Sequence, residues 1–489
     1  MLRLYNTLAG RKEVFEPLVH GIARMYVCGV TVYDYCHVGH ARSALVFDVL
    51  RRYLEYTGLS VEFVKNFTDV DDKIIKRANE QGVSSDAITA TYIAAYYEDM
   101  ERLGIRRAWR EPKATEHIAD IIALVETLVA KGLAYRVNGD VYFSVERYPD
   151  YGRLSKRKLA DLQAGARVEV DERKRHPMDF ALWKSSKSGE PWWESPWGPG
   201  RPGWHIECSA MSMKHLGETF DIHGGGMDLI FPHHENEMAQ SSGSTGKEFA
   251  RYWVHNGFVQ INQEKMSKSL GNFFTIREIF EKSEWPEEVT GEMLRYFLLA
   301  THYRSPLDFS DQSLAEAKNA LDGFYDLLNR LDETDVKKEP SGAPLRELVM
   351  QARLNFTHAM DDDLNSPVAL AEIQKLRNEV NKLVTDGLSV EDRRAVRQEF
   401  KRLGEVLGLF QLDRWQFNPS RTISAGERAT VTGVSSMSLD EVEIQKQIDE
   451  RNDARRRKDF KKADEIRQCL ASQGITIEDR PDGTSRWKR

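Results

Sequence analysis

The chain has 489 residues, of which 41% are apolar and 30% charged, and its 69 basic and 76 acidic side chains give a formal net charge of −7. This length predicts two to four domains. The acidic balance excludes a protein that binds nucleic acid through its overall charge, but not one with a local basic surface. Four cysteines are too few for a disulfide framework and suit a reducing compartment. Because no segment has the apolar character of a signal peptide or a membrane span, we expect a cytoplasmic protein with no membrane partner.

The first 75 residues are predicted to fold as strand, helix and strand. Residues 24–33 are rich in β-branched and aromatic side chains, as in a buried strand, and residues 37–58 place apolar side chains at helical spacing before a terminal Gly58. Residues 61–69 give the second strand. Two strands joined by a helix cross over right-handed and lie parallel. Ligands of such sheets bind at the carboxyl ends of the strands, near helix N-termini.

A change of pattern between residues 111 and 200 predicts a domain inserted into this sheet. Helical segments are followed there by short strands and by loops rich in Trp, Gly and Pro. The strand–helix pattern resumes near Phe220, and residues 275–304 are helical again. The expected fold is therefore α/β, with a Rossmann-type parallel-sheet domain formed by residues 1–110 and 201–300 and a connective domain, residues 111–200, inserted between them.

The rest of the chain is predicted to be mainly helical. Amphipathic helices are expected at about 311–332, 345–360, 366–386 and 390–409, and they form an all-α bundle over residues 301–415. Residues 416–438 are rich in Ser, Thr and Gly and indicate a linker. The small C-terminal module, residues 439–489, contains the segment 451–467 with eight basic and four acidic side chains. Such a segment is either a solvated helix face or, with Trp487 near the end, a surface that contacts RNA.

Two motifs have the chemistry to bind a nucleotide. The motif HVGH, residues 37–40, lies where the first strand passes into the first helix, and a helix N-terminus attracts phosphate. The motif KMSKS, residues 265–269, lies in a polar loop whose lysines can neutralise a pyrophosphate leaving group. Either motif alone is typical of ordinary surface, but the two together, in this order, resemble the HIGH and KMSKS signatures of class I aminoacyl-tRNA synthetases. The residues concerned are His37, Gly39, His40, Lys265, Met266, Ser267, Lys268 and Ser269.

A second group of residues has the chemistry to bind a metal. Pro232 at an expected first helical position is followed by His233, and Glu237 lies one turn later on the same face. With Cys28 and Cys208 they offer an imidazole, a carboxylate and two thiolates, which is a tetrahedral zinc donor set. Because the chain has no C-x-x-C pair, the alternative is that both cysteines are small buried apolar residues. The rival donors within the same run are His234 and Glu235.

Several segments resemble cysteinyl-tRNA synthetases specifically, over residues 28 to about 275. The resemblance implies activation of cysteine with ATP and its transfer to tRNA, with the C-terminal half reading the anticodon. It also implies that zinc is held by Cys28, Cys208, His233 and Glu237 and takes the substrate's sulfur as a further ligand. The segments are CGVTVYDYCHVGHAR, NFTDVDDKII, MDFALWK, GRPGWHIECSAM, DIHGGGMDLIFPHHENEMAQ and KMSKSLGNF.

The implied use of zinc has an independent physical reason. A pocket distinguishes two amino acids that differ by a methyl-sized group by only about 1–3 kcal/mol. Zinc binds a thiolate well and a serine hydroxyl poorly, so that ligand chemistry can separate cysteine from serine without an editing domain. We therefore expect one Zn²⁺ per chain, and Mg²⁺ that arrives with ATP.

The resemblance also assigns a cysteine-binding pocket. Asp228 is the expected partner of the substrate ammonium, Thr68 and Trp204 shape the pocket, and Gly29 admits the substrate closely. Three further acids could hold magnesium, but capping of a helix N-terminus explains them equally well. These acids are Asp69, Asp71 and Asp72, and the cysteines that we interpret as packing residues are Cys36 and Cys469.

The expected reaction begins with attack of the cysteine carboxylate on the α-phosphate of ATP. His37 and His40 would stabilise charge at that phosphate, and Lys265 and Lys268 would hold the pyrophosphate. The cysteinyl group then moves to the terminal ribose of tRNA(Cys), and we expect a monomer. Two alternatives are a ligase that joins cysteine to an amino-sugar and an RNA-binding zinc protein without catalysis.

Overall fold

The computed structural model describes residues 1–158, 173–261, 264–265, 274–332 and 342–418, and beyond these two short strands and a few single positions. The chain divides into two compact units, Met1–Pro419 and Ser420–Arg489. In the second unit the described strands are β14 (Thr476–Asp479) and β15 (Ser485–Lys488), which pair antiparallel. The predicted basic helix and the linker lie outside the described residues, apart from single positions.

A four-stranded parallel sheet forms the centre of the first unit. Its order is β10 (Ala250–Asn256), β9 (Phe220–Gly226), β3 (Ile22–Thr31) and β4 (Ser60–Thr68). The prediction of a parallel sheet is confirmed. The register between β3 and β4 shifts between Val27 and Val30, so regular pairing is interrupted at Cys28 and Gly29. Such an irregularity can re-aim a side chain, and here it falls at the carboxyl end of the strand.

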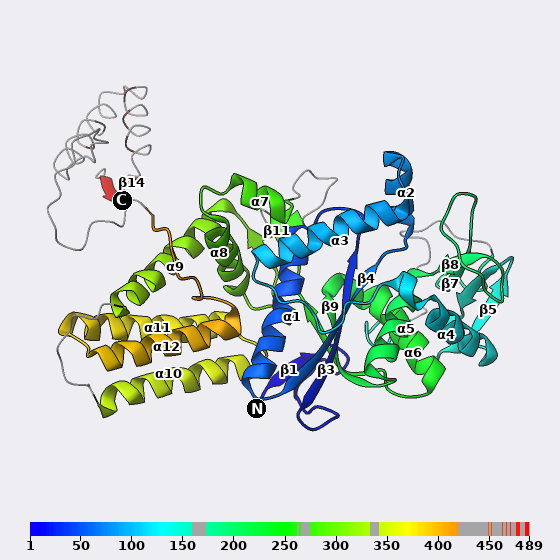
Figure 1. Ribbon diagram of the computed structural model, residues 1–489, viewed down its shortest axis with the longest axis horizontal. Helices are drawn as coiled ribbons and strands as arrows, with labels where there is room; N and C mark the ends of the chain where they lie inside the picture. The colour runs from blue at the N-terminus through cyan, green and yellow to red at the C-terminus, as the bar shows by residue number, and fades with distance from the viewer. Residues whose placement is uncertain are drawn as a thin grey trace. The chain divides into compact units, whose positions relative to one another are not determined.

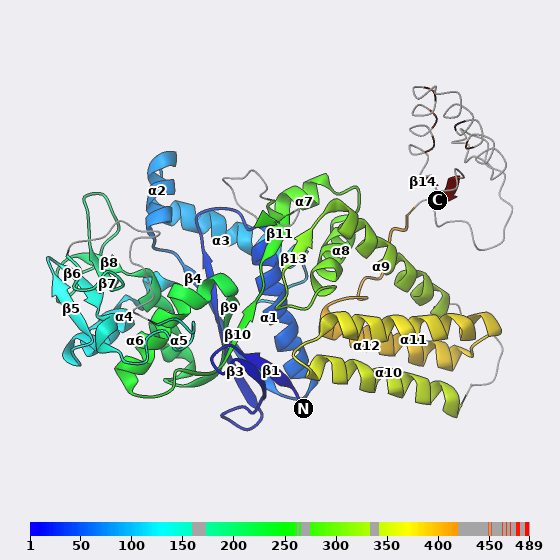
Figure 2. The ribbon, with the colours of Figure 1, turned by 180° about the vertical axis from the view of Figure 1, so that it is seen from behind.

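Helices cover this sheet on both sides. Helix α1 (Val38–Tyr56) lies on one side, and α5 (Trp204–Leu216) and α6 (Glu235–Thr245) lie on the other (Figures 1 and 2). Every residue of α1 from Ala44 to Leu50 is buried, so the middle of this helix is enclosed on all sides. The helices α2 (Asp72–Gln81) and α3 (Ser85–Arg102) follow β4.

Part of the chain segment between β4 and β9 forms a separate small layer outside the central sheet. It contains α4 (Ile118–Ala130) and the antiparallel strands β5 (Ala134–Val137), β6 (Asp140–Phe143), β7 (Phe180–Ser185) and β8 (Gly200–Pro202). Asn138 and Gly139, both with positive φ, make the tight turn between β5 and β6. The apolar core of this layer, which includes Val125, Phe143 and Leu182, is shared with Ile206 of α5 and Ala239 of α6.

Short elements join the sheet to the helical part of the chain. Strand β11 (Val259–Ile261) pairs antiparallel with β12 (Glu264–Lys265) and parallel with β13 (Leu307–Phe309). The helices α7 (Ile276–Lys282) and α8 (Glu287–Leu299) lie between β12 and β13 in the chain. The strands β1 (Arg3–Asn6) and β2 (Arg11–Val14) form an antiparallel hairpin.

The predicted helical bundle is present. It consists of α9 (Asp311–Leu331), α10 (Ala343–Asp361), α11 (Ser366–Asp386) and α12 (Val390–Leu407), which lie together beside α8 and α1 (Figure 1). The side chains of Ser310, Asn365 and Ser389 cap the N-termini of α9, α11 and α12. The observed α/β fold with a helical C-terminal part is therefore the predicted one.

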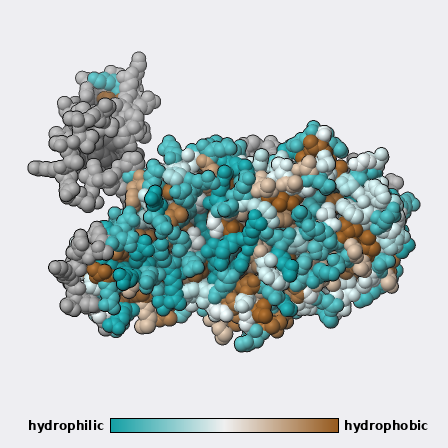
Figure 3. All heavy atoms as spheres, in the orientation of Figure 1, coloured by the Kyte–Doolittle hydropathy of each residue, from teal (hydrophilic) through white to brown (hydrophobic). Residues whose placement is uncertain are grey.

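The outer surface of the described residues is mostly polar. Hydrophilic side chains cover most of the face in Figure 3, and apolar residues show in small groups between them. Among the described residues, no helix combines the length and the apolarity that crossing a membrane requires.

Candidate functional site

A cleft of about 440 Å³ opens at the carboxyl end of the central sheet. One wall comes from the N-terminus of α1, with His37, Gly39 and His40. Cys28 and Gly29 from the end of β3 also line it. The cleft therefore lies where parallel sheets bind ligands, between strand ends and a helix N-terminus. Other lining residues include Lys65, Lys73, Trp204, Asp228, Phe258 and Val259.

The two histidines of α1 hold each other in place. The Nδ1 atom of His37 accepts a hydrogen bond from the backbone N–H of Gly39 (3.0 Å), and the Nδ1 atom of His40 accepts one from the backbone N–H of His37 (3.2 Å). Their rings stack with centroids 3.8 Å apart. Because each Nδ1 accepts, a neutral ring carries its proton on Nε2. Each imidazole is thus in the tautomer that can donate a hydrogen bond from Nε2.

The chain segments before and after residues 266–273 are both attached near this helix N-terminus. In the segment that follows residue 273, Phe274 O accepts a hydrogen bond from the backbone N–H of Val38 (3.3 Å), and the backbone N–H of Ile276 donates to Cys36 O (2.9 Å). In the segment that precedes residue 266, Gln260 of β11 pairs with Lys265 of β12. Lys265 was expected in a loop, and its backbone instead belongs to a two-residue strand. Met266, Ser267, Lys268 and Ser269 lie outside the described residues, as does the Lys265 side chain.

Arg42, which the sequence reasoning did not single out, connects α1 to β11 and β13. Its buried guanidinium donates to the backbone carbonyls of Phe258 (2.7 Å), His302 (3.2 Å), Tyr303 (3.3 Å) and Ser305 (2.5 Å). Burial lowers its pKa to about 10. No carboxylate among the described residues forms an ion pair with Arg42. Backbone carbonyls alone therefore balance the charge, and they fix the start of β11 against the helix.

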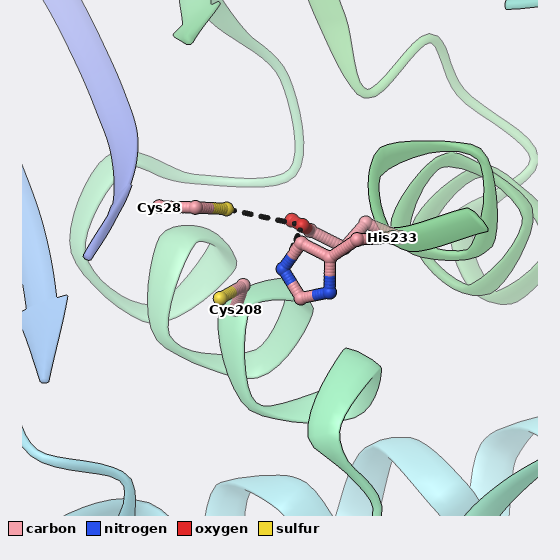
Figure 4. A group of neighbouring side chains, drawn as sticks. Cys28, Cys208 and His233 are labelled. Carbon is pink, nitrogen blue, oxygen red and sulfur yellow. Dashed lines mark hydrogen bonds and ion pairs between the residues drawn. The ribbon is translucent and has the colours of Figure 1, made fainter. Parts of the chain in front are cut away.

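Four candidate metal donors meet beside the cleft, and one of them, Cys28, also lines it. The ligand atoms of Cys28, Cys208, His233 and Glu237 all lie within 4.8 Å of one another, and all four residues are buried. Glu237 Oε1 accepts from Cys28 Sγ (3.1 Å) and lies 2.9 Å from His233 Nε2. Figure 4 shows Cys28 and His233 turned toward the same carboxylate, with Cys208 on the neighbouring helix.

Different elements bring these donors together. Cys28 comes from the irregular end of β3, Cys208 from α5, and Glu237 from the first turn of α6. Phe231 has extended backbone angles (φ −139°, ψ 129°) and breaks the segment Ile230–His234, η5, so the helical residues that lead into α6 begin at Pro232, as expected. His233 and Glu237, four residues apart, both reach the cluster.

The charges of this cluster suit a divalent cation. Burial disfavours the ionised form of Glu237, but His223 and His233 hold its pKa well below the ordinary value. Burial would also raise the pKa of Cys208, yet the hydrogen bond from Cys28 and the contact with His233 lower it to about 6. Burial, followed by Cys208 and Glu237, raises the pKa of Cys28 well above its usual range. The cluster thus contains a carboxylate and a thiolate, whose negative charge is now balanced by protons on neighbouring side chains. A metal ion bound by the same groups would replace those protons and balance the charge itself.

Further histidines support the cluster, and the sequence reasoning missed them. His223 Nε2 lies 2.8 Å from Glu237 Oε2, and His205 Nδ1 lies 2.8 Å from His233 Nδ1. Trp204 stacks on the His233 ring at 4.2 Å. Such contacts orient metal ligands. The segments HIEC and DIHGGG contain His205 and His223, so their position beside the predicted donors was an available signal.

The structure separates the rival donors. The Glu235 carboxylate accepts from the backbone N–H groups of Gly152 (2.9 Å) and Ser155 (2.7 Å), so it serves the inserted layer. His234 belongs to an overlapping donor group and forms a hydrogen bond with His255 (2.8 Å). That second group consists of Cys28, His223, His234 and Glu237. Two buried donor sets therefore share one thiol and one carboxylate.

The predicted pocket residues divide into two groups. Gly29, Trp204 and Asp228 line the cleft, and Trp204 is 38% exposed. Thr68 does not line it, because its side chain is buried and donates to Glu207 Oε2 (2.9 Å). A Cβ on Gly29 would lie 1.5 Å from the backbone oxygen of Asn66. Glycine is thus required there by the close approach of β4.

The remaining predicted acids and cysteines have structural contacts. Asp69 accepts from the hydroxyl (2.5 Å) and the backbone N–H (3.0 Å) of Thr115. Asp71 caps α2, and Asp72 forms ion pairs with Lys184 and Arg201. Cys36 is buried in the core around α1, and burial, followed by nearby Asp99, raises its pKa to about 12. Cys469 lies outside the described residues.

Family comparisons match three parts of the chain. Residues 14–319 match the model of the tRNA synthetases class I (C) catalytic domain. Residues 355–411 match the DALR domain, and residues 442–487 match the cysteinyl-tRNA ligase anticodon binding domain.

Curated relatives match the chain over its full length. The cysteine–tRNA ligase of Geobacter sulfurreducens is 54% identical over 100% of this chain and 99% of its own. The cysteine–tRNA ligase of Geobacter metallireducens is 53% identical over the same shares, and that of Thermodesulfovibrio yellowstonii 50%.

Solved structures share the fold at low sequence identity. A methionyl-tRNA synthetase of Mycobacterium tuberculosis in complex with methionyl-adenylate has a TM-score of 0.57 and 17% identity, over 79% of this chain and 89% of that one. The LeuRS–tRNA–LeuAMS complex of Agrobacterium radiobacter K84 has a TM-score of 0.58 and 13% identity, over 84% of this chain and 89% of that one. These likenesses support the class I synthetase fold.

Proposed function

Since the chain belongs to the cysteine–tRNA ligase family of class I aminoacyl-tRNA synthetases, we propose that it activates L-cysteine with ATP and transfers it to tRNA(Cys). The observation that carries this proposal is the position of Cys28. It lines the cleft beside the N-terminus of α1, and it also belongs to the buried donor cluster. A substrate whose carboxylate faces the α1 terminus could therefore present its side-chain thiol to a metal beside the same cleft.

The nucleotide site would use His37, Gly39 and His40, with the lysines of the KMSKS motif. Each neutral histidine can donate from Nε2 to an α-phosphate oxygen, because its Nδ1 already accepts a backbone hydrogen bond. Lys265 and Lys268 would neutralise the pyrophosphate, with Mg²⁺ on the nucleotide. Met266, Ser267 and Ser269 would complete the loop. The backbone of Lys265 pairs with Gln260 of β11, and the neighbouring Phe258 and Val259 line the cleft, which supports a position for this lysine beside the nucleotide.

The metal would be zinc, held by Cys28, Cys208, His233 and Glu237. Two sulfur donors, one nitrogen and one oxygen are a zinc donor set, and their present separations of at most 4.8 Å leave little movement for them to surround one ion. Bound zinc would supply a Lewis acid that accepts a thiolate far better than a hydroxyl, and so favours cysteine over serine. Trp204 and His205 would hold His233 in its orientation.

The cysteine pocket would lie between this cluster and α1. Asp228 would accept hydrogen bonds from the substrate ammonium, and Trp204 would cover its side chain. Gly29 would leave its backbone open to the cleft. Thr68 would act indirectly, because it is buried against Glu207 on the helix that carries Cys208.

Each domain would have the role that the sequence predicts for it. Residues 1–110 and 201–300 would form the catalytic domain, 111–200 the connective insertion, 301–415 the bundle and 416–438 the linker. Residues 439–489 would read the anticodon. The separate antiparallel sheet of the inserted layer and the match to an anticodon binding domain support this division. A centre with two thiols and a thiol substrate suits the reducing cytoplasm, and we propose a monomer.

Two assays test the proposal together. Cysteine-dependent exchange of pyrophosphate into ATP should occur without tRNA, and cysteinyl-tRNA should form when tRNA(Cys) is added. Exchange without any charged tRNA would indicate a ligase with another acceptor, and no exchange at all would mean that the cleft is not catalytic. X-ray absorption at the zinc edge should report one added Zn–S bond when cysteine binds, and an unchanged spectrum would contradict the use of the metal.

A further inference from the structure

The segment 105–113, which we call the Arg107 ridge, covers the outer edge of the central sheet. It follows α3 and runs along β4, the edge strand. The backbone N–H of Arg110 donates to Phe63 O (3.2 Å), and that of Lys65 donates to Arg110 O (3.0 Å). The ridge is therefore held as an extra strand, and its outward side chains are presented on a rigid backbone.

The ridge exposes aromatic and cationic groups in contact with one another. Trp109 is 47% exposed, and the guanidinium of Arg110 lies 4.7 Å from its ring centroid. The guanidinium of Arg107 lies 3.8 Å from the ring of Tyr97. Two planar cations thus lie on aromatic rings at the surface, where a stacked base and a phosphate could both be bound.

The acidic residue of the ridge accepts hydrogen bonds from neighbouring groups of the protein. Glu111 accepts from the hydroxyl of Tyr97 (2.9 Å) and the backbone N–H of Ala108 (3.3 Å). In the described part of the chain, Arg107 and Arg110 form no ion pair with a carboxylate. The ridge is therefore a locally positive surface on a chain of net charge −7, and a polyanion would meet unneutralised cations there.

The ridge also lies close to the catalytic cleft. Lys65, whose backbone bonds to Arg110, lines that cleft with its side chain. In the other direction the ridge approaches the end of α5. Burial, then His117, and then the charge of Arg110 lower the pKa of His215 there, which favours its neutral form. A nucleic-acid chain bound along the ridge would be separated from the cleft by the single β-strand β4.

We infer that the Arg107 ridge binds an unpaired segment of the tRNA near the end that is charged. A base stacks on Trp109, and the flanking phosphates contact Arg107 and Arg110. This inference rests on the proposed function, because it assumes that tRNA is the acceptor. The paired aromatic and guanidinium groups favour unpaired RNA over a protein partner, since every base offers a π-face for stacking.

The test uses the full-length protein and measures tRNA binding and cysteine activation separately. Trp109→Ala should weaken tRNA binding about 5- to 150-fold, and Trp109→Phe should restore most of the affinity. The double variant Arg107→Ala/Arg110→Ala should reduce the slope of log K against log salt by about 1.4, if each arginine contacts one phosphate of a single strand. Pyrophosphate exchange, which needs no tRNA, should stay at the wild-type rate in all of them.

The matched control is Arg3→Ala/Arg11→Ala, which also removes two arginine charges, but from the β1–β2 hairpin. Unchanged tRNA affinity in the ridge variants, or an equal loss in the control, would overturn the inference. A loss of exchange as large as the loss of tRNA binding would show that the ridge only supports the fold, and would also overturn it. A loss confined to the arginine pair would refute Trp109 as a base platform. If the wild-type protein charges no tRNA at all, the proposed function itself fails instead.

Discussion

Replacing Arg42 with methionine should slow cysteine activation without removing the metal. Arg42 lies in α1, two residues after His40, and its hydrogen bonds to four carbonyls fix the segment that begins β11. Phe258 and Val259 of that segment line the cleft, and β11 pairs with the strand that contains Lys265. Methionine has a similar length and no donor, so the variant removes this attachment and leaves the helix intact.

The size of the effect follows from the bonds that are lost. A hydrogen bond that involves a charged group contributes about 1.5–3 kcal/mol, and two of the four, at 2.5 and 2.7 Å, are short. Their loss is offset in part because a buried guanidinium no longer has to be desolvated, which leaves a net cost of roughly 2–4 kcal/mol. A displacement of about 1 Å at a reacting group can lower the rate about 100-fold. We therefore expect kcat for pyrophosphate exchange to fall by about 10- to 100-fold.

The control variant is Arg52→Met, in the same helix. Arg52 donates to Asp48 Oδ2 (2.8 Å), Gly104 O (2.9 Å) and Glu405 O (3.1 Å), all on the side of the bundle and away from the cleft. It should lower the melting temperature without changing kcat for exchange. Zinc content should stay near one per chain in both variants. Wild-type exchange by folded Arg42→Met, or an equal fall in both variants, would refute the reasoning.

Three further predictions concern the loop, the metal and the bundle. Lys268→Ala should abolish most pyrophosphate exchange while zinc content, measured by atomic absorption, stays near one per chain. Cys208→Ser should lower zinc content and also the ratio of cysteine to serine activation, because a hydroxyl is a poor zinc ligand. Burial raises the pKa of Glu292 to about 7, so the folded state favours its protonated form. The contribution of Glu292 to the free energy of unfolding is fully present below about pH 4.5. It is lost as the pH rises through 7, by at most about 3 kcal/mol. Glu292→Gln should therefore lose less melting temperature between pH 5.5 and pH 8 than the wild type does.

Each of these predictions has a clear contrary result. Loss of zinc in Lys268→Ala would mean that the loop supports the metal cluster. Unchanged preference for cysteine in Cys208→Ser would remove the metal from substrate selection. An identical pH dependence of the melting temperature in wild type and Glu292→Gln would mean that burial does not hold Glu292 neutral against the hydrogen bonds that it accepts from Phe410 N–H and the Tyr325 hydroxyl.

The helices and strands were largely predictable because their signals are local. Apolar spacing placed α9, α11 and α12 within two residues of their observed ends, and the β-branched run at residues 24–33 identified β3. Pro232 marked the start of the helical residues that lead into α6, because the extended residue before it is Phe231 and proline suits the first turn of a helix. Lys265 was placed in a loop because its strand has only two residues, Glu264–Lys265, which are too few to show an alternating pattern.

Residue identity by itself determined which chemistry this chain can perform. The paired HVGH and KMSKS motifs resembled a class I synthetase, and the resemblance of six longer segments to cysteinyl-tRNA synthetases, not the two thiols and the HHENE run alone, indicated cysteine as the substrate. Only the tertiary structure decided which groups meet. It directed Glu235 to the inserted layer, placed His223 and His205 against the predicted donors, and buried Thr68 below the cleft. Contacts between residues far apart in the chain depend on how elements pack, and no local pattern in the sequence encodes those distances.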